Sequence, residues 1–167
     1  MLMIIRSMRE LNFHWLMDVY RESNMLNGME FYPEKEPNEQ LLLAEADFYQ
    51  YLSDVFFRNP DSFYAVWKLD NGYSAALRVE PFRDGMLING LETAPELRQQ
   101  GFAAKLVFSV VDYLSKQGNG VLYSHVSKSN IPSLSLHNKC GFKINSNCAV
   151  YLDGSVLNNS YTLSITR

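Results

Sequence analysis

The stretch Leu91–Ala104, LETAPELRQQGFAA, determines how the rest of the chain is interpreted. An apolar run ends at Pro95, Arg98 and Gly101 follow, and a helical pattern then begins. A strand, a tight turn and a helix start therefore follow one another. The first backbone N–H groups of a helix have no partners within it, and the helix macrodipole adds about half a positive charge there. The stretch therefore predicts a phosphate-binding turn, and the residues that form it are Gln99, Gln100, Gly101, Phe102 and Ala103.

Arg98 adds weight to this prediction. A cation near a helix N-terminus interacts unfavourably with the positive end of the macrodipole unless an anion binds to both, and a pyrophosphate is such an anion. The alternative is an ordinary strand-to-helix connection, in which Gly101 eases packing and Arg98 is solvated. Because glycine-containing loops are common, the stretch taken alone leaves both interpretations open.

Length and composition indicate a soluble globular protein. The 167 residues fit a single domain, residues 1–167, with room for a proper core; 47% of them are hydrophobic and 20% charged. The formal net charge of −3 argues against a nucleic-acid partner, which usually requires a basic face. The opening apolar run is interrupted by Arg6, and no stretch approaches the roughly 18 apolar residues of a membrane span. We therefore expect a cytoplasmic protein that binds neither nucleic acid nor membrane.

The two cysteines predict no special chemistry. Cys140 and Cys148 do not have metal-ligand spacing, and two cysteines do not make a disulfide framework. We expect both to be reduced packing residues, and we expect no metal site.

The N-terminal half changes from helical to alternating periodicity near residue 60. Asp70-Asn71-Gly72 and Asp84-Gly85 are hairpin signals, so the strands beside them form a meander. The predicted elements are a strand at 3–6, a helix at 10–22, an acidic loop at 23–37, a helix at 38–58, and strands at 62–69, 73–81 and 86–93.

The C-terminal half adds a crossover and a hairpin. Apolar residues after Gly101 recur on one face, which predicts an amphipathic helix ending at Gly118 or Gly120. This helix links the strand at 86–93 to a parallel strand at 121–126, and two such strands must splay or continue the sheet. Asn130 is a good N-cap for a short helix at 132–139. A hairpin of strands at 142–152 and 155–165 completes an α+β fold.

Two motifs in this order resemble those of the GNAT superfamily of N-acetyltransferases. A strand, then Arg98-x-x-Gly101-x-Ala103, then an amphipathic helix resembles the acyl-CoA-binding motif of that family. The segment Asn130–Phe142, N-x-x-S-x-x-L-H-x-K-x-G-F, is similar to its next motif, in which an asparagine opens a helix that ends in Gly-Phe. The resemblance implies a GNAT-like, mostly antiparallel sheet of six to seven strands with one splayed parallel pair and about four flanking helices.

The resemblance also implies acetyl-CoA as a co-substrate. The backbone amides from the turn would hold the pyrophosphate, and the strand before it would pair with the pantetheine arm as a short extra strand. In the family a main-chain N–H on this strand also polarises the thioester carbonyl. The implied cofactor-binding residues are Leu91, Thr93, Arg98, Gln99, Gln100, Gly101, Phe102, Ala103, Ala104, Asn130, Ser133 and His137.

The implied reaction is direct attack of an amine on the thioester, which requires alignment, a proton acceptor and help for the leaving thiolate. Many family members have a tyrosine where this chain has His137, and an imidazole can also donate a proton. His137 is thus the candidate donor, unless it only contacts the cofactor or packs the cleft. Glu92 is the candidate base, although strand alternation can turn it away. His125 is its rival, Asn89 can orient a water, and an already deprotonated amine needs no base.

Acceptor specificity in such folds depends on the region of the first two helices, by analogy with the fold. That region suits a cationic or aromatic amine, or is simply a solvated acidic loop, and its residues are Tyr20, Glu22, Glu30, Phe31, Tyr32, Glu34 and Glu36. Two functions follow. One is an N-acetyltransferase acting on the primary amine of a small molecule or peptide, and the other is a non-catalytic acyl-CoA-binding sensor or interaction module. Exposed edges of the terminal hairpin also predict a homodimer.

Overall fold

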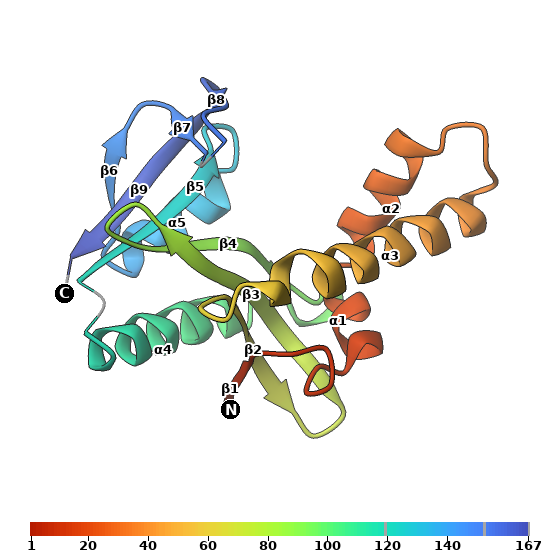
Figure 1. Cartoon of the computed structure of the whole chain (residues 1–167), viewed down its shortest axis with the longest axis horizontal. Helices are drawn as coiled ribbons and strands as arrows, with labels where there is room; N and C mark the ends of the chain where they lie inside the picture. Colours follow the sequence, from red (N-terminus) through yellow and green to blue (C-terminus); the bar gives the residue numbers. More distant parts are fainter. Residues whose placement is uncertain (119, 152, 167) are drawn as a thin grey trace.

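A seven-stranded mixed sheet, ordered β1-β2-β3-β4-β5-β9-β6, organises the molecule (Figure 1). The computed structural model describes residues 1–118, 120–151 and 153–166. The strands of the sheet are β1 (Leu2–Ile5), β2 (Phe63–Leu69), β3 (Gly72–Phe82), β4 (Gly85–Thr93), β5 (Val121–Ser127), β6 (Lys143–Ser146) and β9 (Ser160–Thr166). A separate ribbon consists of β7 (Ala149–Val150) and β8 (Val156–Leu157). The helices are α1 (Phe13–Val19), α2 (Arg21–Phe31), α3 (Pro37–Asp54), α4 (Phe102–Lys116) and α5 (Ile131–Lys139), with 3-10 turns η1 (Phe56–Arg58) and η2 (Pro95–Leu97).

One pair of neighbouring strands in the described sheet, β4 and β5, is parallel, and its pairing covers only Met86–Ile88 against Leu122–Ser124. The other neighbours are antiparallel. The expected α+β fold, with a mostly antiparallel sheet of six to seven strands and one splayed parallel pair, is therefore confirmed. The described chain has five α-helices where about four were expected.

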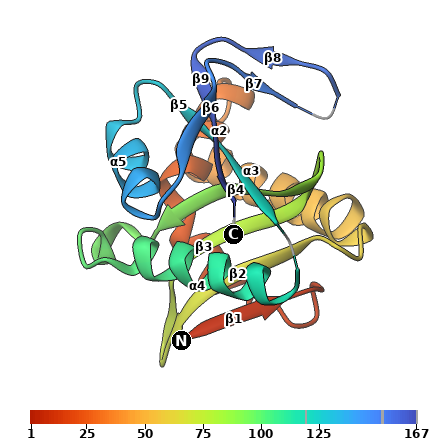
Figure 2. The same cartoon turned by 90° about the vertical axis from the view of Figure 1, so that its left-hand side faces the viewer.

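Two layers of helices cover the two faces of the sheet (Figure 2). Alternate strand residues point to opposite faces, so Ala65 and Leu77 lie in the core beneath α4, whereas Tyr64 and Val66 lie in the core beneath α1 and α3. The predicted amphipathic face of α4 is buried as expected. No helix in the described ranges is both long and apolar enough to cross a membrane.

The predicted helix at 10–22 is confirmed over Phe13–Val19, where α1 ends, and the predicted loop at 23–37 is wrong over residues 23–31, which are helical. The chain forms two helices there, α1 and α2, and α2 continues to Phe31. The reason is tertiary packing: a Cβ on Gly28 would lie 2.5 Å from the carbonyl oxygen of Gln40, so this glycine lets α2 approach the backbone of α3. Together α2 and α3 form an arm that projects from the sheet (Figure 1).

The predicted terminal hairpin is interrupted in the middle. Its register shifts between Ile144 and Ser146, and the Ser146 hydroxyl accepts a hydrogen bond from the Cys148 N–H at 3.3 Å. A side chain that bonds its own backbone competes with the ladder, so the strand leaves the sheet and continues in the β7–β8 ribbon. The predicted strand end at Leu152 lies outside the described residues. The sheet edges are β1 and β6.

The remaining sequence predictions differ from the structure only in detail. The helix predicted at 38–58 is α3, which begins at Pro37, ends at Asp54 and is followed by η1. Both cysteines are free thiols, and Cys140 is buried in the core, as expected for packing residues.

Candidate functional site

A bulge in β4 opens the sheet where the candidate site lies. Ala76 pairs with Glu92, but Arg78 pairs with Asn89, so β4 contains one extra residue at this point. Gly90 lies in the bulge with a φ of 59°, a left-handed conformation that glycine adopts at little steric cost. Within the described strands, pairing of β4 with β5 ends at Ile88. The two strands separate beyond it, which creates the predicted splay.

Tyr20 holds the bulge from the helical layer. Its buried hydroxyl donates a hydrogen bond to the carbonyl oxygen of Gly90, and the Gly90 N–H donates to Oδ1 of Asn89 at 2.8 Å. Tyr20 was predicted as an acceptor-region residue only. Its contact with the bulge crosses 70 residues of sequence, and no local pattern signals it.

Three cavities meet at residues 90–92 of this bulge. The splay cavity, about 180 Å³, lies between β4, β5 and α5 and includes Gly90 and Leu91. The long groove, about 680 Å³, includes Leu91 and Glu92 and continues between the turn before α4 and the start of α5. The arm cavity, about 280 Å³, includes Gly90 and Glu92 and lies between β4 and the α2–α3 arm. A group placed at the bulge therefore has access from three directions.

The long groove brings the two sequence motifs together. Residues from the first motif line one wall and residues from the second line the other; they are Leu91, Glu92, Thr93, Arg98, Gln99 and Ala103 against Asn130, Pro132, Ser133 and Leu136. Five further residues predicted to bind the cofactor do not line the described groove: Gln100, Gly101, Phe102, Ala104 and His137. Asn130 has a structural role in addition, because its Oδ1 accepts the Ser133 N–H at 3.1 Å and caps α5.

The backbone before α4 suits an anion. Gln99 and Gly101 have φ values of 62° and 81°, and such left-handed residues belong to turns that gather N–H groups into a concave surface. In the described structure no side chain caps the N-terminus of α4, and its first turn contains no acidic residue. The first N–H groups of a 15-residue helix are thus left for an external acceptor.

Arg98 has a partner that the sequence did not reveal. Its guanidinium lies 2.7 Å from Oε2 of Glu22 on α2, and both side chains are about half exposed. An exposed ion pair contributes about 0–1 kcal/mol, so an anion in the long groove, which Arg98 also lines, can compete for the guanidinium.

His137 lies in the wall of the splay cavity, with only 1% of its surface exposed. Its Nδ1 lies 2.8 Å from the carbonyl oxygen of Ser133. Because a carbonyl only accepts, the single N–H of the neutral ring is on Nδ1, and Nε2 has a lone pair. Nε2 is buried and has no partner in the described structure, and burial lowers the pKa of His137. Donation from Nε2 therefore requires a doubly protonated ring, which burial disfavours.

Glu92 lines both the long groove and the arm cavity, so strand alternation does not turn it away from the bulge. Burial raises the pKa of its carboxyl above the ordinary value, although the Ser23 hydroxyl and the Arg98 charge oppose that shift. A carboxylate with a raised pKa is better matched to accept a proton near neutral pH.

The rival base and the water-orienting residue lie in the splay cavity. His125 packs edge-on against Tyr151 and Phe82, with ring centroids 4.7 and 5.3 Å away, and burial lowers its pKa. The Asn89 side-chain oxygen accepts the Gly90 N–H, so this residue helps to hold the bulge, and its amide NH2 group is still available to orient a water.

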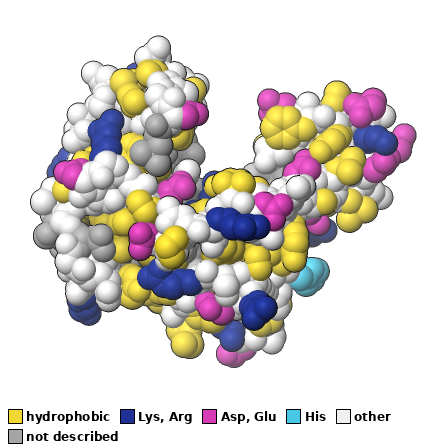
Figure 3. All heavy atoms as spheres, in the orientation of Figure 1, with side chains coloured by type: hydrophobic (Ala, Val, Ile, Leu, Met, Phe, Trp, Pro, Cys, Tyr) yellow, Lys and Arg dark blue, Asp and Glu magenta, His cyan; other side chains and the backbone are white. Residues whose placement is uncertain are grey.

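The arm cavity contains only part of the predicted acceptor region. Tyr20 and Phe31 line it, whereas five predicted residues do not: Glu22, which pairs with Arg98, and Glu30, Tyr32, Glu34 and Glu36. The Tyr32 hydroxyl instead donates to Asp47, a cavity residue on α3. Figure 3 shows a deep hollow between the α2–α3 arm and the lobe that carries β7 and β8. Sequence reasoning missed Arg78, which also lines this cavity. The one feature that could have indicated it is a charged residue within the otherwise apolar centre of β3.

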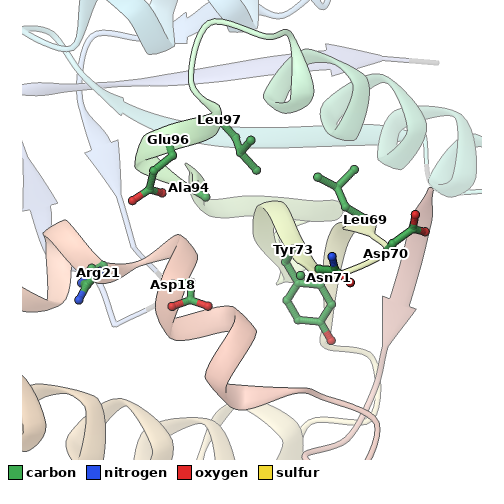
Figure 4. A pocket seen from close by; sticks show the side chains of 10 residues that line it. Asp18, Arg21, Leu69, Asp70, Asn71, Tyr73, Ala94, Glu96 and Leu97 are labelled. Atoms are coloured by element: carbon green, nitrogen blue, oxygen red, sulfur yellow. The ribbon is translucent and has the colours of Figure 1, made fainter.

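A fourth cavity, about 570 Å³, lies apart from this arrangement (Figure 4). Asp18 on α1 and Glu96 in η2 come from opposite sides of it, and the β2–β3 turn closes a third side. It shares no lining residue with the three cavities at the bulge. Its Tyr73 hydroxyl accepts the Asn12 N–H at 3.1 Å, so that group is already used in the fold.

Comparison with known proteins agrees with this geometry. The model of the acetyltransferase (GNAT) family matches residues 14–142. Among solved structures, the PaiA N-acetyltransferase from Thermoplasma acidophilum in complex with coenzyme A has 14% identity and a TM-score of 0.66, covering 100% of this chain and 99% of that one. The IAA acetyltransferase from Bacillus cereus has 16% identity and a TM-score of 0.61, covering 100% of both chains.

A third structure is the ribosomal-protein-S18-alanine N-acetyltransferase from Escherichia coli. It has 18% identity and a TM-score of 0.56, covering 73% of this chain and 76% of that one. A search of curated proteins returned no match. At these identities, the structural likenesses concern the fold.

Proposed function

Because this chain belongs to the acetyltransferase (GNAT) family, we propose that it transfers the acetyl group of acetyl-CoA to a primary amine of a small molecule or peptide. The observation that carries this proposal is the meeting of three cavities at the β4 bulge. One cavity, about 680 Å³, runs from the bulge to the turn before α4, one lies in the splay, and one lies beside the α2–α3 arm. A two-substrate reaction requires such an arrangement, since two molecules must reach one point from different sides.

We place acetyl-CoA in the long groove, whose two walls carry the two sequence motifs, and the PaiA structure of the same fold was determined in complex with coenzyme A. The amides of residues 99–104 and Arg98 would hold the pyrophosphate, and the backbone of Leu91 and Thr93 would pair with the pantetheine arm. Asn130 and Ser133 would contact it from the opposite wall. The splay supports this placement, because β4 backbone beyond Ile88 is not paired with β5 in the described sheet.

The chemistry at the bulge then needs few groups. Acetyl-CoA supplies an activated thioester, and a main-chain N–H of β4 would polarise its carbonyl. Glu92 would accept the ammonium proton, directly or through a water, because it lies between the groove and the arm cavity. His137 is the candidate donor to the leaving sulfur. Because its Nδ1 proton is bound to the Ser133 carbonyl, it would donate from Nε2, and only while the ring is doubly protonated.

Release of free thiol from acetyl-CoA tests the proposal. We expect turnover with at least one member of a panel of primary amines, including small polyamines, amino acids and short peptides. Calorimetric titration with CoA is measured in parallel. Tight CoA binding without turnover on any amine contradicts the proposed transfer and supports the second function, a non-catalytic acyl-CoA-binding module. The observation that favours this second function is His137 at the position where many relatives have a tyrosine.

A further inference from the structure

The arm cavity contains a partly buried arginine that forms no salt bridge with any described residue. Arg78, on β3, lines the cavity, and its Nε is buried and makes no hydrogen bond in the described structure. Removing a charge from water is costly unless it is paired and hydrogen-bonded, so this guanidinium is in an incomplete environment.

The surroundings of Arg78 fix its position and leave its hydrogen-bond donors unused. The rings of Tyr51 and Phe48 on α3 lie 5.3 and 6.0 Å from the guanidinium carbon. On the strand side, a Cβ on Gly90 would lie 3.2 Å from both Nε and Nη2. Aromatic faces attract the charge, but they do not replace acceptors for the five N–H groups of the planar fork. The fork therefore lies between these rings and the bulge and is suited to a carboxylate, which binds it in bidentate fashion.

The other charges of the cavity have the opposite sign. Glu92 lies at the bulge end, next to the long groove, and Asp47 lies on α3, where it accepts the Tyr32 hydroxyl. Glu80 is two residues from Arg78 on the same strand and does not line the cavity. The cavity thus combines carboxylates with one arginine, which complements a molecule that carries both an ammonium and an anionic group.

We propose that the amine acceptor carries a carboxylate, as an amino acid does, and that Arg78 binds this carboxylate while the amine lies near Glu92. This inference rests on the proposed acetyl transfer and names its substrate class. The cavity volume of about 280 Å³ is at the small end for ligand sites, which agrees with an acceptor of amino-acid size. Recognition through Arg78 also orients the acceptor, because one end is held at the aromatic wall and the other faces the thioester.

The test compares each protein amino acid with the amine that remains when its carboxylate is removed, for example phenylalanine with 2-phenylethylamine. We expect the wild-type protein to have a higher kcat/KM for the amino acid of at least one such pair. Replacing Arg78→Met should lower that kcat/KM by about 10- to 100-fold and leave the rate with the matched amine unchanged. Glycine, β-alanine and 4-aminobutyrate then measure the preferred distance between amine and carboxylate.

Two further variants keep the test decisive. Arg78→Lys retains the charge and loses the fork, so we expect an intermediate loss. Arg58→Met removes an exposed arginine outside the four cavities and should leave both substrates unaffected. CoA titration verifies that each variant is folded, and titration of the preferred amino acid into the CoA complex measures its affinity without turnover.

The outcomes separate this inference from the proposed function. Acetylation of amines alone, with no preference for a carboxylate, overturns the role of Arg78 and leaves acetyl transfer intact. An unchanged preference in Arg78→Met overturns it as well. Absence of turnover with every amine and amino acid contradicts the acetyl transfer itself, and this inference with it.

Discussion

The hydrogen bond from Tyr20 to the Gly90 carbonyl predicts that Tyr20→Phe damages both stability and catalysis. Tyr20 is 5% exposed, and its hydroxyl is the donor that satisfies the carbonyl of the bulge. Leaving such a buried acceptor without a partner costs about 1–3 kcal/mol. For a domain of this size, each kcal/mol lowers Tm by about 2–4 °C, so we expect a fall of about 2–12 °C.

The same variant loosens the point at which the three cavities meet. A displacement of about 1 Å at reacting groups is enough to cost about 100-fold in rate, so we expect kcat to fall by about 10- to 100-fold. Urea unfolding gives the free energy, and thiol release from acetyl-CoA gives kcat.

Tyr64→Phe is the matched control for this variant. Tyr64 is fully buried beside Tyr20, and its hydroxyl has no hydrogen-bond partner in the described structure. Its removal should change the free energy of unfolding by less than about 0.5 kcal/mol, or increase it. Equal losses in the two variants would refute the assigned hydrogen bond. A destabilised Tyr20→Phe protein with full kcat would refute the link between bulge and rate.

Three further predictions concern the base, the histidine and the arm. Glu92→Gln should lower kcat by about 10²- to 10⁴-fold without changing CoA affinity, and full turnover by this variant excludes Glu92 as the base. The wild-type rate should fall as pH falls through the raised pKa of Glu92, because the carboxylate form is required. Burial lowers the pKa of His137, so its doubly protonated form is populated only toward acid pH. The ratio of the wild-type kcat to the His137→Phe kcat should therefore decrease as pH rises from about 6 to about 8, and a constant ratio contradicts proton donation. Gly28→Ala places a Cβ 2.5 Å from the Gln40 carbonyl oxygen, so it should lower the free energy of unfolding by about 1–3 kcal/mol and raise the acceptor KM. Met29→Ala, at a residue that is 59% exposed on the same helix, should leave both values nearly unchanged. Equal effects of the two variants contradict the close helix contact.

The sequence predicted those elements whose signals are local. The turn before α4 and the helix itself follow from Gly101 and from apolar residues at helical spacing, and the structure has both. The β2–β3 and β3–β4 hairpins follow from their turn residues in the same way. The prediction of α2 failed because Gly28, a helix breaker by local criteria, lies where two helices touch.

In the candidate site, too, the sequence predicted the local features and did not predict the contacts between distant residues. Sequence alone determined the strand, the turn before α4 and the two motifs that line the long groove, because these depend on residues a few positions apart. It also supplied Glu92 and His137 as candidates. Tertiary structure decided which groups meet: Tyr20 with Gly90, Arg98 with Glu22, and Arg78 with the rings of α3. It also decided which form His137 takes, since burial sets its pKa and the Ser133 carbonyl holds its proton on Nδ1. Such pairings depend on how helices pack across the sheet, and desolvation depends on everything packed around a group, so neither is encoded in any short stretch of the chain.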